Sequence, residues 1–249
     1  MPPFLVDVHW CNLAGVGERP SRIFGHRVSS GQLIDGGLSM DLFDAIAGRT
    51  SIRKFKDEPV PDKDIRKILD AGRLAPSANN TQPWSFLVIK DMKTLTMMAE
   101  AVREMIDRMI PHAEDEKQAQ RLAAYKGTYY TFFEKAPVVI AVFMEGYDAG
   151  TEKLLATMGY SAEDIKRLRP APGLQSVAAA IEHMLLAIHA LGYGSCWMTG
   201  PLVAQETFEK ILGYGKEKFI AALLPVGVPN EHPEARPRKT LEEIVTRIG

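Results

Sequence analysis

The chain has 249 residues, of which 46% are hydrophobic and 24% are charged, so it can build a sizeable core of ordinary globular composition. Its 30 basic and 31 acidic residues leave a formal charge of -1, which gives no global electrostatic reason to expect nucleic acid or an anionic membrane as a partner. Two cysteines, Cys11 and Cys196, exclude a disulfide framework and cannot form a four-ligand zinc site unaided.

Compartment and membrane association follow from the apolar runs of the sequence. No stretch approaches the roughly 18 apolar residues of a membrane-spanning helix. The first residues, MPPFLVDVHWC, lack the basic region and the unbroken apolar run of a secretory signal. We therefore expect a cytoplasmic protein without a membrane or nucleic-acid partner.

The first part of the chain differs in composition from the rest. Residues 1–38 are rich in Gly, Pro, Ser and Arg and show no sustained hydrophobic period, which predicts an irregular N-terminal arm in front of a folded domain at 39–249. Two interpretations of the arm stay open: it wraps a partner subunit, or it precedes a true start at Met40. Ser39 is predicted to be the N-cap of a first helix over 40–49.

The remaining chain alternates helices with short strands, which predicts one layered domain with helices on both faces of a sheet. The helix over 174–191 is apolar on nearly all sides, as expected at the centre of a domain or of a dimer. The predicted helices lie between Pro61 and Pro76 and over 95–110 (beginning at Asp91), 115–135, 161–168, 174–191 and 203–212. The predicted strands cover 84–90, 137–143, 193–199 and 219–228.

A short basic motif follows the first predicted helix. In an extended chain, alternate side chains point the same way, so Arg49, Ser51 and Arg53 share one face. The planar guanidinium fork suits phosphate because it donates two parallel hydrogen bonds to the oxyanion. Taken alone, this motif is more typical of a solvated basic turn.

A second basic cluster lies near the end of the chain. In Arg236-Pro237-Arg238-Lys239, the proline favours an extended path that places two arginines on one side. Such a tail is usually a solvated surface. If it folded back onto the first cluster, the two would form a phosphate site without a glycine-rich loop.

Other common catalytic motifs are missing from the sequence. Gly192, Gly194 and Gly200 do not have dinucleotide-fingerprint spacing, and no phosphate-binding P-loop occurs. Ser195 lacks the second glycine of a nucleophile elbow, which argues against acyl transfer. Cys196 has no basic neighbour in the sequence and is predicted to be a buried, inert thiol.

Three ordered segments carry a resemblance to a known family. The run AIAGRTSIRKFKDEPVPDKDIRKILDAGRLAPSANNTQPWSFLVI resembles the N-terminal signature of the FMN-dependent nitroreductase family, LGYGSCWMTGP resembles its second signature, and LLPVGVPNEHPEARPRKTLEEIV resembles its C-terminal element. The resemblance covers about 39–246, whereas 111–172 falls where the family varies. It implies an α+β fold: a dimeric three-layer α/β/α sandwich with a mainly antiparallel central sheet.

The resemblance also implies a cofactor site. By position, the first cluster supplies flavin contacts, with Arg49 directed at the phosphate and Arg53 at the N1/C2 carbonyl edge of the ring. A loop reaches FMN from the other subunit, a later segment runs beside the ring, and the C-terminal arginines contact the phosphate. The implied cofactor residues are Arg49, Thr50, Ser51, Arg53, Pro76, Ser77, Ala78, Asn80, Gln82, Met198, Thr199, Gly200, Arg236 and Arg238.

The implied activity is a ping-pong oxidoreductase. Hydride would pass from NADH or NADPH through flavin N5 to small electron-poor acceptors such as nitroaromatics and quinones, without a metal or a catalytic protein nucleophile. The sites would lie at the interface of a homodimer. Relatives of this fold that remove halogen, dehydrogenate heterocycles or break down flavin keep other reactions open. A non-catalytic flavin carrier or interaction protein is the alternative from another class.

Overall fold

The computed structural model describes residues 33–34, 37–38, 40–147 and 149–248. The chain divides into two compact units, Met1–Leu38 and Ser39–Gly249. In the first unit, Leu33–Ile34 (β1) and Gly37–Leu38 (β2) pair in an antiparallel manner. The rest of the expected N-terminal arm lies outside the described residues, so its irregular structure stays a prediction.

The second unit is built on a four-stranded antiparallel sheet in the order β3-β4-β6-β5. Its strands are Trp84–Ile89 (β3), Val138–Glu145 (β4), Gly194–Ser195 (β5) and Lys218–Gly227 (β6). The central strands β4 and β6 are almost entirely buried, because both faces of their continuous apolar runs are covered by helices. The mainly antiparallel sheet agrees with the predicted fold class.

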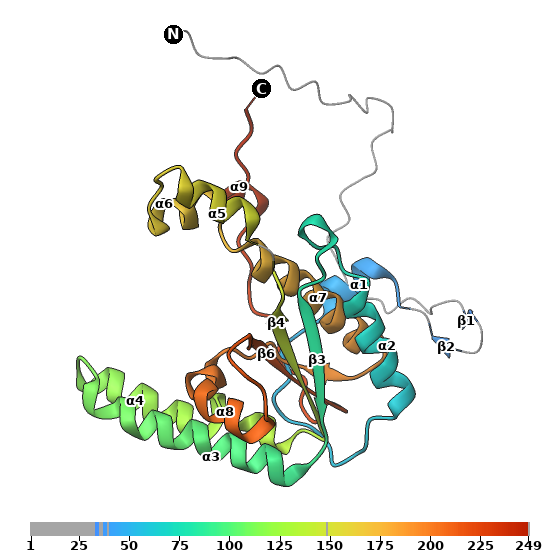
Figure 1. The fold of residues 1–249 in the computed structure, drawn as a ribbon. Coiled ribbons are helices and arrows are strands. Elements are labelled where there is room, and N and C mark those ends of the chain that lie inside the picture. The colour runs from blue at the N-terminus through green and yellow to red at the C-terminus, as the bar shows by residue number, and fades with distance from the viewer. Residues whose placement is uncertain (1–32, 35–36, 39, 148, 249) are drawn as a thin grey trace. The chain divides into compact units, whose positions relative to one another are not determined.

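Helices cover both faces of this sheet (Figure 1). On one face, Met92–Met109 (α3) and Gln205–Leu212 (α8) pack into a hydrophobic cluster that contains Phe133. On the other face, Asp62–Arg73 (α2) and Pro172–Ala190 (α7) enclose a second cluster around Met184. The α/β/α layering predicted from the alternation of helices and strands is therefore confirmed.

Shorter elements complete the unit. The remaining α-helices are Leu42–Gly48 (α1), Glu116–Ala124 (α4), Gly150–Thr157 (α5), Ala162–Leu168 (α6) and Leu241–Ile244 (α9). The 3-10 helices are Ala78–Asn80, Ile110–His112, Phe132–Lys135 and Gly200–Ala204. Among the described residues, no single helix is long and apolar enough to cross a membrane; α6 and α7 meet those criteria only together, across a 41° bend.

The start of the first helix differs from the prediction. Asp41 is the N-cap, since its carboxylate accepts a hydrogen bond of 2.8 Å from the backbone N–H of Phe43. Ser39, the predicted cap, lies outside the described residues. Aspartate is as good a cap as serine, so the helix begins after Asp41 and not after the predicted Ser39.

Two predicted elements are shorter than expected. The helix over 115–135 ends at Ala124 and continues as a π-helical turn, Tyr125–Tyr129, before the 3-10 helix Phe132–Lys135. The strand over 193–199 is only β5, because the chain leaves the sheet and returns for one bridge between Met198 and Leu223. Cys196 and Met198 are buried by packing although they lie outside β5, and a sequence period cannot distinguish burial by packing from burial in a strand.

A β-bulge interrupts the pairing of the two central strands. Val142 pairs with Ala222, but the next residue, Phe143, pairs with Ile220, which leaves Ala221 as an extra residue in β6. Side chains on either side of a bulge lose strict alternation. Ile220 and Leu223 therefore both enter the cluster beneath α3 and α8.

Candidate functional site

The first arginine motif lies beside the second signature segment. The backbone N–H of Ile52 donates to the carbonyl oxygen of Ser195 over 2.9 Å, and Ser51 forms a parallel bridge with Ser195. Ile52 is buried, so this extended segment is held against the end of the sheet by both packing and hydrogen bonding. Segments far apart in sequence thus meet where the resemblance placed a cofactor.

The chain beyond β6 joins the same motif from the other side. The Lys56 N–H donates to the Val228 carbonyl oxygen, and the Asn230 N–H donates to the Lys54 carbonyl oxygen, each over 2.9 Å. Phe55 also bridges Pro229. The chain after β6 therefore contacts the first motif at residues 228–231, whereas the combined site of the sequence analysis required the basic cluster at 236–239 to do so.

A cavity of about 390 Å³ opens beside Arg49. Its size falls in the range of ordinary small-molecule sites. Ser195 is 5% exposed, and its buried hydroxyl oxygen finds no hydrogen-bond partner among the described residues. The cavity is lined by Met40, Gly48, Arg49, Thr50, Ile52, Leu185, Ile188, His189, Gly192, Tyr193, Ser195, Pro229, Glu231, His232 and Pro233.

Histidine and arginine face each other in this cavity. Burial lowers the pKa of His189, and the positive charge of Arg49 lowers it further. The imidazole also lies against the first helix, because a Cβ atom on Gly48 would be 2.9 Å from its Nε2 atom. The cavity therefore presents the Arg49 guanidinium together with an imidazole whose pKa is lowered.

Cys196 lies on the other side of the arginine motif. Burial raises the pKa of its thiol, whereas Arg53, a hydrogen bond with Ser51 and Arg49 lower it by smaller amounts. The sequence showed no basic residue beside this cysteine, but the fold brings two arginines close to it. Because burial outweighs their charge, the prediction of an inert buried thiol agrees with this environment.

The residue that fixes the backbone of Arg53 was not anticipated from the sequence. Oε1 of Glu231 accepts hydrogen bonds from the backbone N–H groups of Arg53, at 2.5 Å, and Lys54, at 3.2 Å. The Arg53 guanidinium curls back to donate to the carbonyl oxygen of Ser51 over 3.3 Å. An acidic residue near an expected phosphate site gives no signal that a motif search would select.

The loop predicted to reach the cofactor has an unusual backbone. Asn79, Asn80 and Gln82 have φ values of 53°, 54° and 47°, which non-glycine residues rarely adopt. The N–H of Ala78 donates to Oγ of Ser176 on α7, and the N–H of Gln82 donates to Oγ of Ser77. Residues held this way in strained conformations cluster at functional sites.

This loop does not complete the site within one protomer. Among the residues that the structure describes, no hydrogen bond or ion pair links the predicted loop residues to the arginine motif. These loop residues are Pro76, Ser77, Ala78, Asn80 and Gln82. Their expected contribution from a second subunit stays a prediction.

The segment predicted to run beside the flavin ring is partly buried. Met198 is 4% exposed and exchanges two backbone hydrogen bonds of 3.0 Å with Leu223, whereas Thr199 is exposed. A Cβ atom on Gly200 would lie 2.3 Å from the ring of Tyr130, so this position accepts only glycine without displacement of the tyrosine.

The C-terminal arginines are not brought to the motif. Arg236 and Arg238 are exposed, and in the described part of the chain they form no hydrogen bond or ion pair with residues 49–53. Only the neighbouring residues 228–231 make that contact. The structure thus places Arg49 and Thr50 on the lining of the cavity, whereas Ser51 and Arg53 do not line it and these two C-terminal arginines lie outside the motif.

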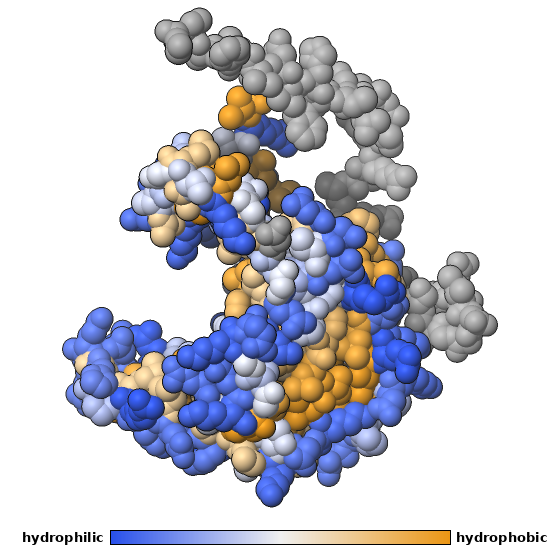
Figure 2. Space-filling view, viewed as in Figure 1, coloured by the Kyte–Doolittle hydropathy of each residue, from blue (hydrophilic) through white to orange (hydrophobic). Residues whose placement is uncertain are grey.

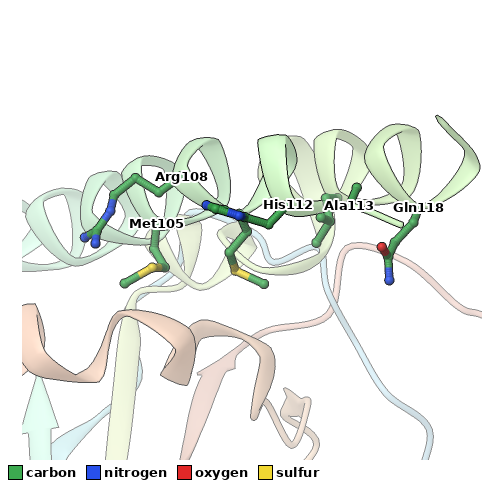
Figure 3. Close-up of a pocket in the computed structure, with 7 residues that line it drawn as sticks. Met105, Arg108, His112, Ala113 and Gln118 are labelled. Carbon is green, nitrogen blue, oxygen red and sulfur yellow. The ribbon is translucent and has the colours of Figure 1, made fainter. Parts of the chain in front are cut away.

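A second cavity, of about 380 Å³, lies where α3 gives way to α4. Figure 3 shows Met105 and Gln118 extending from the same side of the two helices. None of the predicted cofactor residues lines it; its lining is Met105, Arg108, Met109, His112, Ala113, Gln118 and Leu122. Across the described ranges, no group of three metal-ligating side chains is found either. The cavity beside Arg49 is therefore the candidate cofactor site.

Comparison with known proteins finds a matching family model, a similar sequence and a similar solved structure. The Nitroreductase family model matches residues 46–228. An NADH dehydrogenase of Thermus thermophilus is 30% identical over 228 residues, covering 83% of this chain and 95% of the relative. A BluB-like flavoprotein of Clostridium difficile 630 is 35% identical, with a TM-score of 0.78 over 84% of this chain and all of the other.

A further solved structure adds a bound cofactor. Oxidized iodotyrosine deiodinase, solved with FMN and 3-iodo-L-tyrosine, is 26% identical, with a TM-score of 0.63 over 84% of this chain and 99% of the other. The matched family region contains the arginine motif, the strained loop and the second signature segment. This chain belongs to the nitroreductase family.

Proposed function

We propose that this protein is an FMN-dependent oxidoreductase that uses NADH or NADPH to reduce small electron-poor acceptors such as nitroaromatics and quinones. The observation that carries the proposal is the convergence of the arginine motif, β5 and residues 228–231 around the cavity beside Arg49. Membership of a family of named oxidoreductases supports it.

The residues present fit a phosphorylated cofactor. Arg49 offers a guanidinium fork at the cavity, Thr50 offers a hydroxyl group, and the buried Ser195 hydroxyl lacks a partner that a ligand atom could supply. We propose that Arg49 holds the phosphate and Arg53 faces the ring, with Thr50, Ser51, Met198, Thr199 and Gly200 completing the protomer's own contacts. Arg236 and Arg238 would join at the phosphate once the exposed tail is ordered by a ligand or partner.

The chain's own residues would bind and orient rather than react. FMN, when bound, supplies the hydride chemistry. Arg53 would place a fixed positive charge at the ring edge, where preorganised charge is worth far more than in water. Cys196 remains a buried packing group, and the unpartnered Ser195 hydroxyl, which no described histidine activates, serves in binding.

We further propose a homodimer in which each site uses the strained loop of the partner subunit. Several large apolar side chains are exposed on α1 and near the C-terminus: Leu42, Phe43, Ile46, Leu241, Ile244 and Val245. Figure 2 shows another apolar area over the sheet next to β3, where Leu87 is 36% exposed. Apolar surface of this extent is typical of protein interfaces.

The test begins with the purified full-length protein. Its absorbance spectrum and an FMN titration establish whether the flavin binds, and sedimentation establishes the subunit number. Anaerobic mixing with NADH and then NADPH should bleach the flavin, after which a nitroaromatic or a quinone should restore its colour. A colourless monomer that ignores added FMN would overturn the proposal, and bound flavin that neither nucleotide reduces would favour a non-catalytic flavin carrier.

Reductive dehalogenation is the second candidate. It is favoured by the structural similarity to the deiodinase solved with FMN and 3-iodo-L-tyrosine. Iodide release from iodotyrosine, measured beside nitroaromatic turnover with the same reduced enzyme, separates the two activities. Parallel incubations with a reduced heterocycle and with free reduced flavin test the dehydrogenase and flavin-fragmenting alternatives.

A further inference from the structure

Two backbone amides of the arginine motif lack a strand partner. The motif pairs with Ser195 at one end and with residues 228–230 at the other. Between these ends, the N–H groups of Arg53 and Lys54 would have no acceptor, and the single oxygen Oε1 of Glu231 accepts from both. A side-chain carboxylate thus completes an interrupted ladder at the position that orients Arg53.

We propose that Glu231 is a positioning residue that fixes the backbone of Arg53 and, through its negative charge, lowers the reduction potential of the bound cofactor. This inference rests on the proposed function. Glu231 lines the same cavity as Arg49, so its carboxylate lies at the proposed cofactor site.

The hydrogen bonds described for the Glu231 carboxylate are to backbone amides and not to the Arg49 or Arg53 guanidinium groups. No ion pair joins Glu231 to Arg49 or Arg53 among the described residues, since the Oε1 atom of Glu231 accepts from two backbone amides instead. The Arg53 guanidinium uses one N–H group on the Ser51 carbonyl oxygen. Because a guanidinium has five N–H donors, most of its capacity stays available to a ligand.

Hydrogen bonding and charge can be tested apart. Glu231→Gln keeps an oxygen that accepts from the two amides but removes the negative charge. Glu231→Ala removes both. Glu234→Gln is a matched control, because Glu234 is exposed in the same segment and forms no hydrogen bond or ion pair within the described part of the chain.

The positioning role has a readout that needs no cofactor. In the cofactor-free protein, hydrogen–deuterium exchange of a peptide spanning Arg53 and Lys54 should be about tenfold faster in Glu231→Ala than in wild type, the effect of losing a charge-assisted hydrogen bond. Glu234→Gln should exchange like wild type, and Glu231→Gln, which keeps an accepting oxygen without the charge, should exchange at a rate between those of wild type and Glu231→Ala. Equal exchange in Glu231→Ala and wild type would overturn the positioning role.

The charge role is tested by measuring the midpoint potential of the protein with FMN bound. Glu231→Gln should bind FMN at least as tightly as wild type and shift its midpoint potential in the positive direction, since a negative charge beside the site disfavours added negative charge. Glu234→Gln should leave the potential unchanged. An unchanged potential in Glu231→Gln would overturn the charge role even if Glu231→Ala does not fold. Failure of wild type to bind FMN would overturn the proposed function and the charge role together, whereas the positioning role is decided by the exchange result.

Discussion

Ile52 packs directly on the backbone of Gly194: a Cβ atom on Gly194 would lie 2.7 Å from the Cβ of Ile52. Ile52 is only 7% exposed and donates its N–H to the neighbouring Ser195. A glycine in β5 therefore lets the arginine motif approach the sheet closely. The glycine that failed to fit a dinucleotide fingerprint has this packing role instead.

Gly194→Ala should lower the free energy of unfolding by about 1–3 kcal/mol, as expected for overpacking a filled core. Chemical denaturation measures the loss. Gly127→Ala is the control, because a Cβ atom there would meet nothing within 4 Å. Equal stability of the two variants would show that the motif can shift away from β5 without cost.

Arg53→Ala should weaken FMN binding by about 10- to 100-fold, the range for losing one hydrogen bond to a charged group. Fluorescence titration of the cofactor-free protein measures the change. Lys54→Ala removes the adjacent cation, which is exposed and makes only backbone contacts in the described structure, and should bind like wild type. Similar affinity in both variants would remove Arg53 from the site.

His189 should make the folded protein less stable in acid. Its pKa is lowered by burial and Arg49 from a reference of 6.5, so the unfolded chain binds the proton more readily than the folded one. The contribution of His189 to stability is complete above that reference and is lost as the pH falls below it.

Urea unfolding at about pH 7.5 and about pH 5.5 tests this linkage. His189→Gln should lose less stability than wild type on acidification. His183→Gln is the control on the same helix, where the imidazole is exposed and Nδ1 lies 3.3 Å from the Ala71 carbonyl oxygen. An unchanged pH profile in His189→Gln would contradict the assignment.

Cys196 should react slowly with thiol reagents in the folded protein, because burial raises its pKa and restricts access. A Cys11→Ser variant leaves Cys196 as the single thiol of the chain. Its reaction with an aromatic disulfide should accelerate strongly in denaturant. A native rate equal to the denatured rate would show that the thiol is open to solvent.

The sequence predicted the fold well where periodicity and burial agree. The continuous apolar runs became β4 and β6, and the helix that is apolar on several sides became α7. The prediction of one helix over 115–135 was wrong, because a π-helical turn follows α4 with no proline or glycine before it to mark the change. The prediction also omitted α5, because its N-cap residue, Ala149, has no side chain that could cap a helix.

The site was predictable in its parts but not in its connections. Alternation predicted that Arg49, Ser51 and Arg53 share one face, whereas Arg49 lines the cavity and the other two do not. The family resemblance predicted that the second signature and the C-terminal element lie near this motif. Glu231 was missed because its role comes from two backbone amides without a strand partner, and these exist only after the motif has paired with Ser195 and with residues 228–230. Long-range hydrogen bonds of this kind leave no local period in a sequence.

The extra residue Ala221 decides which way the end of β6 presents its side chains. With it, Ile220 and Leu223 both enter the cluster beneath α3 and α8 although they are three positions apart. If Ala221 instead paired in register with Phe143, plain alternation would turn Ile220 toward α7, with every earlier residue of the strand inverted after it. A one-residue insertion is therefore what lets the first residues of β6 match the faces of their partners in β4.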